Sequence, residues 1–510
     1  MSRYDAIVVG GGVNGLVAGT ILARRGMSVC IVEQADHFGG MAAYSLNGGP
    51  PLAHSLYNLS PRVLKDIGLS SQDAAFSGQT VATVSLSDNG QHIVVDGSRA
   101  SSIDGNTLPE SQALKTLLDS LVSYGELLRQ LAEAPPPGGS HALVSRDGLS
   151  QLLRLAKLGL GLKRLGKPKM RRFLQILLSN VYDLILDELP DGQIAGLLAA
   201  DAVRGAAAGP RSPGTVFNLI YRLGHGGIVS LPHGGMSAVT DLLAKAASDS
   251  DCVLMPDSTI SRILTTGDSV SGIELTTGET VRAPLVLSSI APQQTFRLTG
   301  TGMFDIEASR RIRNIRARGT TAKVNFKLPD GAPLPGLPAD LSGSRLVYAP
   351  SAEYVETAFN PAKYREMSDA PVIEAVRTVS SDGSHWLSTI VQYAPSDIEG
   401  GWTDAKQDRL GRLTLETLNR TLPGLSDLVK DRQVITPDLI ETATGAPGGH
   451  WHHAEMSLDQ LLTLRPANGI GRYAMGPKGL FLCGATTHPG GDVMGLAGRN
   501  AALAALEGQR

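Results

Sequence analysis

Residues 4–40 read YDAIVVGGGVNGLVAGTILARRGMSVCIVEQADHFGG. The run Ala6 to Val9 is apolar and rich in β-branched residues, which is typical of a buried parallel strand. Gly10, Gly12 and Gly15 follow in the pattern G-x-G-x-x-G, and an apolar helical stretch comes directly afterwards. In that setting the glycines allow a tight turn, a close approach to a pyrophosphate and close helix–strand packing. The stretch therefore predicts a dinucleotide site at a helix N-terminus, where free N–H groups attract phosphate.

A second strand and an acidic residue support this interpretation. Ser28 to Val32 is again apolar and is followed by Glu33, roughly 20 residues past the glycines, where an acid accepts hydrogen bonds from an adenosine ribose. The alternative is an ordinary glycine turn in an α/β protein, but such a turn requires neither the helix nor the acid. The combined pattern favours a dinucleotide site.

The residues after Glu33 bear on the choice between FAD and NAD. Glu33 and the pair Gly39-Gly40 form E-x5-G-G, which resembles the flavoprotein form of the motif in the glutathione-reductase and amine-oxidase lineages. In those proteins the glycine pair lets the chain pass close to the FAD pyrophosphate, and an arginine often follows. Met41 stands here instead, so one phosphate contact seen in some relatives is missing. FAD remains the predicted cofactor.

Composition limits the function classes. The chain has 510 residues, 42% of them hydrophobic, enough to bury one large core or two smaller ones. A net charge of −2 and 5% aromatic residues give no reason to expect a nucleic-acid partner. Cys30, Cys252 and Cys483 lie in apolar runs without a C-x-x-C pair, so we expect buried structural thiols.

The sequence shows no targeting or membrane-spanning signal. Its first residues lead directly into a strand, without a charged region followed by an apolar one. No apolar run reaches the roughly 18 residues that a transmembrane helix needs. We therefore expect a cytoplasmic protein.

The order of the predicted elements indicates an α/β fold with a discontinuous first domain. Residues 1–75, 225–300 and 470–510 carry the glycine motif and the buried strands, and predict a Rossmann-like FAD-binding domain of the glutathione-reductase type. Residues 76–224 and 301–469 alternate strands and helices, and predict an inserted mixed α+β substrate-binding domain.

The most basic segment of the chain spans residues 149–188. Its cations lie among leucines and are Arg154, Lys157, Lys163, Arg164, Lys167, Lys169, Arg171 and Arg172. One interpretation is a helix on a membrane surface that gives access to a lipophilic substrate. The other is an ordinary solvated helical face, since glycines and a proline break the periodicity.

Near the C-terminus a second unit has the same order of strand, glycine-rich loop and helix as the N-terminal motif. Lys478 to Gly484 reads as a buried strand, the glycine-rich stretch ATTHPGGDVMGLAGRN follows, and Ala501 to Leu506 reads as a helix. Glycines let the backbone approach a flat ligand, and the helix N-terminus favours an anionic or strongly dipolar group.

Five separated blocks give the chain a family resemblance. They are VVGGGVNGLVAG near the N-terminus, AADAVRGAAAGPRSPGT at 199–215, PHGGMSAVTDLLAKAA at 232–247, HHAEMSLDQLLTLRP at 452–466 and GLFLCGATTHPGGDVMGLAGRNAA at 479–502. In this order they resemble the FAD-dependent phytoene-desaturase-like oxidoreductases of the amine-oxidase and GDI superfamily. The branch they resemble most contains the pyridine nucleotide-disulphide oxidoreductase domain-containing protein 2.

The resemblance implies noncovalent FAD, since no cysteine or histidine tether is evident. The cofactor-binding residues that it implies, together with the motifs, are Gly10, Gly12, Val13, Asn14, Gly15, Glu33, Gln34, Gly39, Gly40, Met41, Ile260, Gly484, Asp492, Val493 and Met494. The first glycines and Glu33 would hold the ADP half, and the C-terminal loop would lie along the ring.

Members of this group remove hydride from an unactivated or allylic carbon, pass it to the flavin and leave a double bond. A proton acceptor then has to come from the protein. The candidates are His488, with Asp492 four residues further on, and His453; other histidines near glycine loops are His225, His233, His450 and His452. His54 lies in a stretch that passes over the flavin in relatives, but a satisfied loop histidine explains it equally well.

Partners and alternatives follow from the same features. The expected substrate is a small lipophilic molecule or an amine, and electrons would leave to oxygen or a quinone-like acceptor, because no second dinucleotide motif is visible. The cluster His450-Trp451-His452-His453 lacks further ligands at metal spacing, so no metal is expected. Two alternatives remain: a carotenoid-type desaturase or isomerase at the membrane surface, and a non-redox lipid-binding protein like the GDP-dissociation inhibitors and Rab escort proteins.

Overall fold

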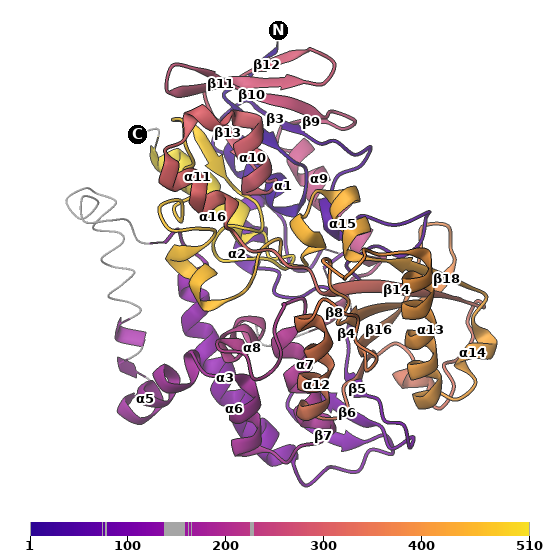
Figure 1. Cartoon of the computed structure of the whole chain (residues 1–510). Helices are drawn as coiled ribbons and strands as arrows, with labels where there is room; N and C mark the ends of the chain where they lie inside the picture. Colours follow the sequence, from indigo (N-terminus) through magenta and orange to yellow (C-terminus); the bar gives the residue numbers. More distant parts are fainter. Residues whose placement is uncertain are drawn as a thin grey trace.

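The computed structural model describes residues 2–73, 75–76, 79–136, 159–161, 163–164, 166–224 and 229–508. Figure 1 shows a lobe with a parallel sheet at the top of the view and a lobe with a larger sheet below it. Arg154 and Lys157 of the basic segment, as well as His225, lie outside the described residues.

The first lobe contains a five-stranded parallel sheet in the order β19-β13-β2-β3-β9. Its strands are β2 (Ala6–Val9), β3 (Val29–Val32), β9 (Val253–Met255), β13 (Val286–Ser288) and β19 (Leu480–Leu482). β2 is fully buried, because Ala6 and Val8 pack in a cluster with helices while Ile7 and Val9 pack against a second sheet. Burial on both faces explains the uninterrupted apolar run, and the predicted α/β fold is confirmed.

Helices cover one face of this sheet and a four-stranded mixed sheet covers the other (Figure 1). The helices are α1 (Val13–Ala23), α2 (Pro61–Ile67), α9 (Gly235–Ser248) and α16 (Leu496–Gly508). The second sheet has the order β1-β12-β11-β10, formed by β1 (Ser2–Arg3), β10 (Ile260–Thr266), β11 (Ser269–Leu275) and β12 (Thr280–Arg282). The antiparallel pairs β10–β11 and β11–β12 form hairpins whose turns lie near residues 267 and 278.

The second lobe contains an eight-stranded sheet in the order β18-β14-β17-β16-β15-β5-β6-β7. The strands are β5 (Thr83–Ser85), β6 (Ile93–Asp96), β7 (Arg99–Ser102), β14 (Thr321–Leu328), β15 (Arg345–Tyr348), β16 (Val372–Val379), β17 (His385–Gln392) and β18 (Asp431–Ile435). Helix α13 (Asp404–Thr421) packs against β18, and its Leu410 and Leu418 share a core with β14 and β17. A two-stranded pair, β4 (Gln79–Thr80) with β8 (Ser230–Leu231), stands apart from it.

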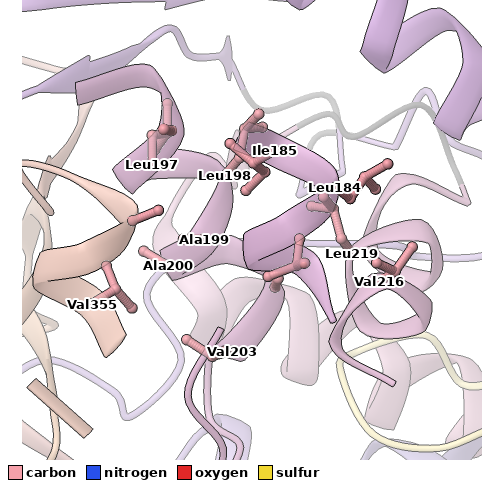
Figure 2. Packing of buried hydrophobic residues seen from close by; sticks show 14 of the residues in the cluster. Leu184, Ile185, Leu197, Leu198, Ala199, Ala200, Val203, Val216, Leu219 and Val355 are labelled. Carbon is pink, nitrogen blue, oxygen red and sulfur yellow. The ribbon is translucent and has the colours of Figure 1, made fainter. Parts of the chain in front are cut away.

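A helical layer packs beside this sheet. It consists of α3 (Ser111–Ala132), α5 (Gly166–Leu177), α6 (Val181–Glu188), α7 (Gln193–Val203), α8 (Thr215–Leu223) and α12 (Ala352–Lys363). Figure 2 shows α6, α7, α8 and α12 interlocking through side chains such as Ile185, Leu198, Leu219 and Val355. The alanine-rich α7 runs through the middle of this cluster, so the residues at its end are fixed by packing on several sides.

The remaining helices are short. They are α10 (Pro292–Thr299), α11 (Ile306–Arg313), α14 (Leu425–Leu428) and α15 (Pro437–Thr444), and 3-10 turns lie at Gly40–Ala42, Thr301–Met303, Ala339–Leu341, Pro447–Gly449, Leu458–Gln460 and Leu462–Leu464. The strands of the five-stranded sheet fall within residues 1–75, 225–300 and 470–510, and those of the eight-stranded sheet within 76–224 and 301–469. The domain boundaries themselves stay a prediction.

Candidate active site

A cavity of about 430 Å³ begins where β2, β3 and β13 end and continues towards the second lobe. This is the edge at which doubly wound sheets bind ligands. Of the residues predicted to bind the cofactor or to act in catalysis, the following line it: Gly10, Gly12, Val13, Asn14, Glu33, Gln34, Gly39, Gly40, Met41, Ile260, His453, Asp492 and Val493.

The glycines at the start of α1 leave no room for side chains. A Cβ on Gly15 would lie 2.0 Å from the Gly10 carbonyl oxygen. Gly12 and Gly40 face each other so closely that a Cβ on Gly40 would lie 3.0 Å from the Gly12 Cα. Gly39 adopts φ 119° and donates its N–H to the Gly11 carbonyl at 2.9 Å. This paired backbone, with the N-terminus of α1 behind it, fits a pyrophosphate.

Glu33 is held in place at the end of β3. Its carboxylate accepts hydrogen bonds from the N–H groups of Gly11 at 2.7 Å and Ala35 at 3.0 Å, and only 8% of the residue is exposed. The cavity there is also lined by Thr259, next to the predicted Ile260, and by three residues that sequence reasoning missed, His37, Arg297 and Leu298. This end fits an adenosine.

The other end of the cavity lies between the C-terminal loop and the second lobe. Its lining includes Ala485, Asp492 and Val493 from the loop, Tyr44 and Leu52 from the segment after the glycine pair, and, from further along the chain, Ser55, Tyr57, Arg204, Trp451 and His453. We call this part the inner end. Ser55, Tyr57, Arg204 and Trp451 were not predicted, although Arg204 lies within the family block at 199–215 and Trp451 within the histidine cluster.

Asp492 combines an unusual backbone with an unpaired carboxylate. Its φ is 69°, in the left-handed region that few residues other than glycine adopt. Its Oδ2 is buried without a hydrogen-bond partner in the described part of the chain, and its Oδ1 lies 3.8 Å from the His452 Nδ1. Strain of this kind persists where the surroundings enforce it, often at functional sites.

The neighbouring histidines are neutral at physiological pH. Burial, aided by His450 and His452, lowers the pKa of His453 to about 4. Burial also lowers the pKa of His452 to about 4, although Asp492 opposes this shift. The His452 ring is fixed because its Nε2 lies 3.0 Å from the Arg204 carbonyl oxygen. Of the two, only His453 lines the cavity.

A buried ionic cluster stands behind the inner end. Arg204 donates from Nε and Nη2 to both oxygens of Glu374, each at 3.0 Å. Arg345 donates from Nη2 to Glu374 at 2.8 Å and also pairs with Asp201. Arg222 pairs with the same Asp201 at 3.3 Å. Burial opposes the charge on Glu374, but Arg204 and Arg345 overcome it and hold its pKa well below the usual range.

Two further basic groups adjoin this cluster. His54 Nε2 lies 2.9 Å from Glu374 Oε1, and burial with Lys323 nearby lowers the pKa of His54 to about 3. Lys323 is fully buried and donates to the Leu52 carbonyl at 2.5 Å. Burial and Arg204 lower its pKa well below the usual range. His54 is thus held by the protein and does not line the cavity.

The remaining predicted residues lie outside the cavity lining. His488 bonds through Nε2 to the Leu131 carbonyl at 3.0 Å, and burial lowers its pKa to about 4. Gly15 and Gly484 support the fold by close packing, since a Cβ on Gly484 would lie 2.3 Å from the Ser289 carbonyl oxygen. The Met494 sulfur lies 3.7 Å from the Tyr221 hydroxyl. His233 and His450 do not line the cavity either.

The cysteines are free and buried, as predicted. Burial raises the pKa of Cys30 and of Cys252 to about 12, and raises that of Cys483 further. Within the described ranges no cluster of three or more histidine, cysteine or acidic side chains is placed to hold a metal ion.

Comparison with known proteins agrees with this geometry. The family described as NAD(P)-binding Rossmann-like domain matches residues 8–70. The pyridine nucleotide-disulfide oxidoreductase domain-containing protein 2 of Rattus norvegicus is 29% identical, over 98% of this chain and 93% of its own length. One subunit of the limonene dehydrogenase of Castellaniella defragrans is 23% identical, over 98% and 94%. The neurosporene-forming phytoene desaturase of Cereibacter sphaeroides is 25% identical, over 54% and 52%.

The chain is an oxidoreductase, related to these proteins. The resemblance drawn from the five sequence blocks is thereby confirmed. Among solved structures, a triple mutant of putrescine oxidase shares the fold with a TM-score of 0.59 at 15% identity, covering 99% of this chain and 98% of the other. The Rossmann-type match and the glycine cradle at the start of α1 indicate a dinucleotide cofactor for this oxidoreductase.

Proposed function

We propose that this oxidoreductase binds FAD noncovalently and removes hydride from a C–H bond of a largely apolar small molecule, leaving a double bond. One observation carries the proposal: a single cavity joins the glycine cradle and Glu33 to an enclosed inner end with Asp492 and His453. Electrons pass on to oxygen or to a quinone-like acceptor. Bound FAD would supply the hydride acceptor.

The protein's own residues would perform the remaining tasks. The backbone of Gly12, Gly39 and Gly40 would hold the pyrophosphate, and Glu33 the ribose. Leu52 and Trp451 would enclose the apolar body of the substrate and exclude water. Asp492 or the neutral His453 would accept the proton that leaves with the hydride, so that a C–H pair on neighbouring carbons becomes a double bond.

Noncovalent binding is supported by the chain's own thiols. Cys483, the cysteine next to the C-terminal loop, is fully buried and does not line the cavity. The same cradle argues against the escort-protein alternative, because a lipid carrier without redox chemistry has no need of Glu33 and an unobstructed glycine pair. A carotenoid-type desaturase or isomerase differs from the main proposal only in substrate and net redox change.

The absorption spectrum of the purified protein, recorded before and after acid precipitation, tests the proposal. Flavin bands that move to the supernatant are the expected result, and a Gly15→Ala protein should lack them because its Cβ would meet the Gly10 carbonyl. Anaerobic bleaching by a panel of alkenes, unsaturated acids and amines then identifies the substrate class. Protein that neither carries nor rebinds flavin would refute the enzyme proposal in favour of a lipid carrier.

A second proposal concerns a membrane surface. In the described ranges no helix is both long and apolar enough to cross a bilayer. However, Leu160, Leu174 and Leu178 are 47%, 56% and 60% exposed, and Lys163, Arg164, Lys167, Lys169 and Arg171 are exposed beside them. We propose that these exposed side chains rest on an anionic lipid surface, since cations flanking exposed leucines are typical of interfacial helices.

A further inference from the structure

The inner end of the cavity holds hydrogen-bond donors that the protein does not use. Ser55 and Tyr57 are each 5% exposed and line the cavity. The Ser55 Oγ and the Tyr57 hydroxyl are both buried without a hydrogen-bond partner in the described part of the chain. Because leaving a buried polar group unsatisfied is costly, two such hydroxyls on the lining of one cavity point to a polar group of a ligand as their partner.

The chain geometry brings these two side chains to the same wall. Residues i and i+2 of an extended segment point to one side, and Leu56 between them forms a bridge with Ser230. Leu56 and Asn58 accordingly line a different cavity, on the opposite side of the segment. The alternation means that Ser55 and Tyr57 are presented together to the inner end.

Arg204 supplies a third donor. Its Nε and Nη2 are committed to Glu374, whereas its Nη1 has no acceptor among the described residues, and Arg204 lines the cavity. Its guanidinium lies over the Tyr57 ring, 4.8 Å from the centroid, and that of Arg222 lies 4.4 Å from the same centroid. Stacking and the bidentate pair with Glu374 hold the third donor rigidly.

The charge of the cluster favours an anion. In the described part of the chain, Arg204, Arg222 and Arg345 form ion pairs with two carboxylates, those of Glu374 and Asp201. Nearby His54 and Lys323 are pushed towards their neutral forms by burial. Asp492, the carboxylate that lines the inner end, helps to raise the pKa of Arg204 but makes no hydrogen bond or ion pair with it, and its Oδ1 lies 3.8 Å from the His452 Nδ1. The paired side chains of the cluster therefore carry one more positive charge than negative charges.

We infer that the inner end binds the carboxylate of the substrate, with Arg204 Nη1 and the hydroxyls of Tyr57 and Ser55 as donors. This inference rests on the proposed function and narrows it: the substrate is an apolar acid, whose hydrocarbon part lies along Leu52 and Trp451. The carboxylate fixes which carbon faces the cofactor. An amine is disfavoured, because its cation would face the Arg204 guanidinium and leave the Nη1 donor unpaired.

Three probes with one carbon skeleton test the inference at pH 7.5: geranic acid, geraniol and geranylamine. Binding is followed by the shift of the flavin absorption band and by calorimetry. We expect geranic acid to bind at least tenfold more tightly than either the neutral or the cationic analogue, since hydrogen bonds to a charged group are strong. The Tyr57→Phe protein should lose about tenfold in affinity for the acid and little for the alcohol.

Matched controls keep the test interpretable. Tyr44→Phe removes a hydroxyl from the same inner end, but it is Tyr57 and not Tyr44 that the arginines of the cluster stack on among the described residues, so this variant should leave the preference for acid over alcohol unchanged. Tyr57→Phe should fold normally because it removes only an unpaired hydroxyl. Equal or undetectable binding of the acid and the alcohol to flavin-loaded protein would overturn the carboxylate site while leaving the proposed function intact. Absence of flavin would refute the proposed function, and calorimetry on the apoprotein would still decide the anion preference.

Discussion

Replacement of Asp492 should change the stability and the activity of the protein in opposite directions. It combines a left-handed backbone, φ 69°, with a buried Oδ2 that lacks a partner in the described structure. Both features oppose folding, and the residue lines the cavity. We therefore expect Asp492→Gly to give a more stable protein that has lost its reaction.

The size of the effect follows from the two costs. An aspartate in the left-handed region costs about 1 kcal/mol relative to glycine, and an unpaired buried carboxylate oxygen costs about 1–3 kcal/mol. Part of this gain is lost to the greater freedom of glycine in the unfolded chain. The net stabilisation should be about 1–2 kcal/mol. With about 2.1 cal/mol/K of unfolding entropy per residue, this corresponds to a Tm increase of roughly 1–2 °C.

The assay compares Asp492→Gly with Asp492→Asn. Asparagine tolerates the same backbone conformation and keeps the shape, but it removes the negative charge and the ability to accept a proton. Flavin content, Tm of the flavin-free protein and the rate of anaerobic flavin bleaching are measured for each. Both variants should retain flavin and lose at least 100-fold in bleaching rate, which is the typical contribution of a positioned base, and only the glycine variant should gain the full stability.

A destabilised Asp492→Gly protein would refute this reasoning, because it would mean that the carboxylate makes favourable contacts in the fold. An unchanged bleaching rate in both variants would assign the proton transfer to His453 instead. Its own replacement, His453→Gln, then serves as the reciprocal experiment.

Two further predictions concern the rest of the molecule. Burial lowers the pKa of His54, His452, His453 and His488 to about 3–4. Below pH 6.5 the unfolded chain therefore binds more protons than the folded one. The free energy of unfolding should be highest above pH 6.5 and should fall by several kcal/mol towards pH 4. Denaturant titrations between pH 4 and 8 check this, and a His488→Gln protein should show a shallower decline. Replacing Lys167, Lys169 and Arg171 by glutamate should abolish co-sedimentation with vesicles that contain phosphatidylserine. The control variant, with Arg310→Glu and Arg313→Glu on the surface of α11, should still co-sediment. If the triple variant and the control variant co-sediment equally, the lipid contact is excluded.

The sequence predicted those parts of the molecule that depend on local patterns. The turn after β2 needs Gly10 because φ is 92° there, and Gly15 because a Cβ would strike the turn. Such requirements can be read from spacing alone. The uninterrupted apolar runs likewise predicted strands covered on both faces, and the described sheet contains them in that form.

The inner end could not be predicted in the same way, because its residues are far apart in the chain. Tyr57, Arg204, Arg345 and Glu374 come from a loop, the end of a helix and two neighbouring strands. Register brings Glu374 opposite Val347, two residues from Arg345. His488 illustrates the opposite case. Its position in a glycine-rich loop suggested a catalytic role, but its Nε2 lies within hydrogen-bonding distance of the Leu131 carbonyl oxygen. Proximity in sequence to a cofactor loop does not reveal which way a side chain turns.

The ionic cluster also argues for a binding role on energetic grounds. Buried ion pairs are often no more stable than well-packed apolar residues of the same volume, because desolvation offsets their attraction. Folding stability alone therefore does not account for three arginines and two carboxylates beside the cavity. The arrangement instead provides the rigid guanidinium of Arg204, whose Nη1 has no acceptor in the described part of the protein. Glu374 fixes the orientation of that guanidinium, so Glu374→Gln should weaken binding of the acid although all three donors remain. Arg204→Lys should also weaken binding of the acid, even though the positive charge is kept, because an ammonium cannot bond to Glu374 and to the ligand in the same planar geometry.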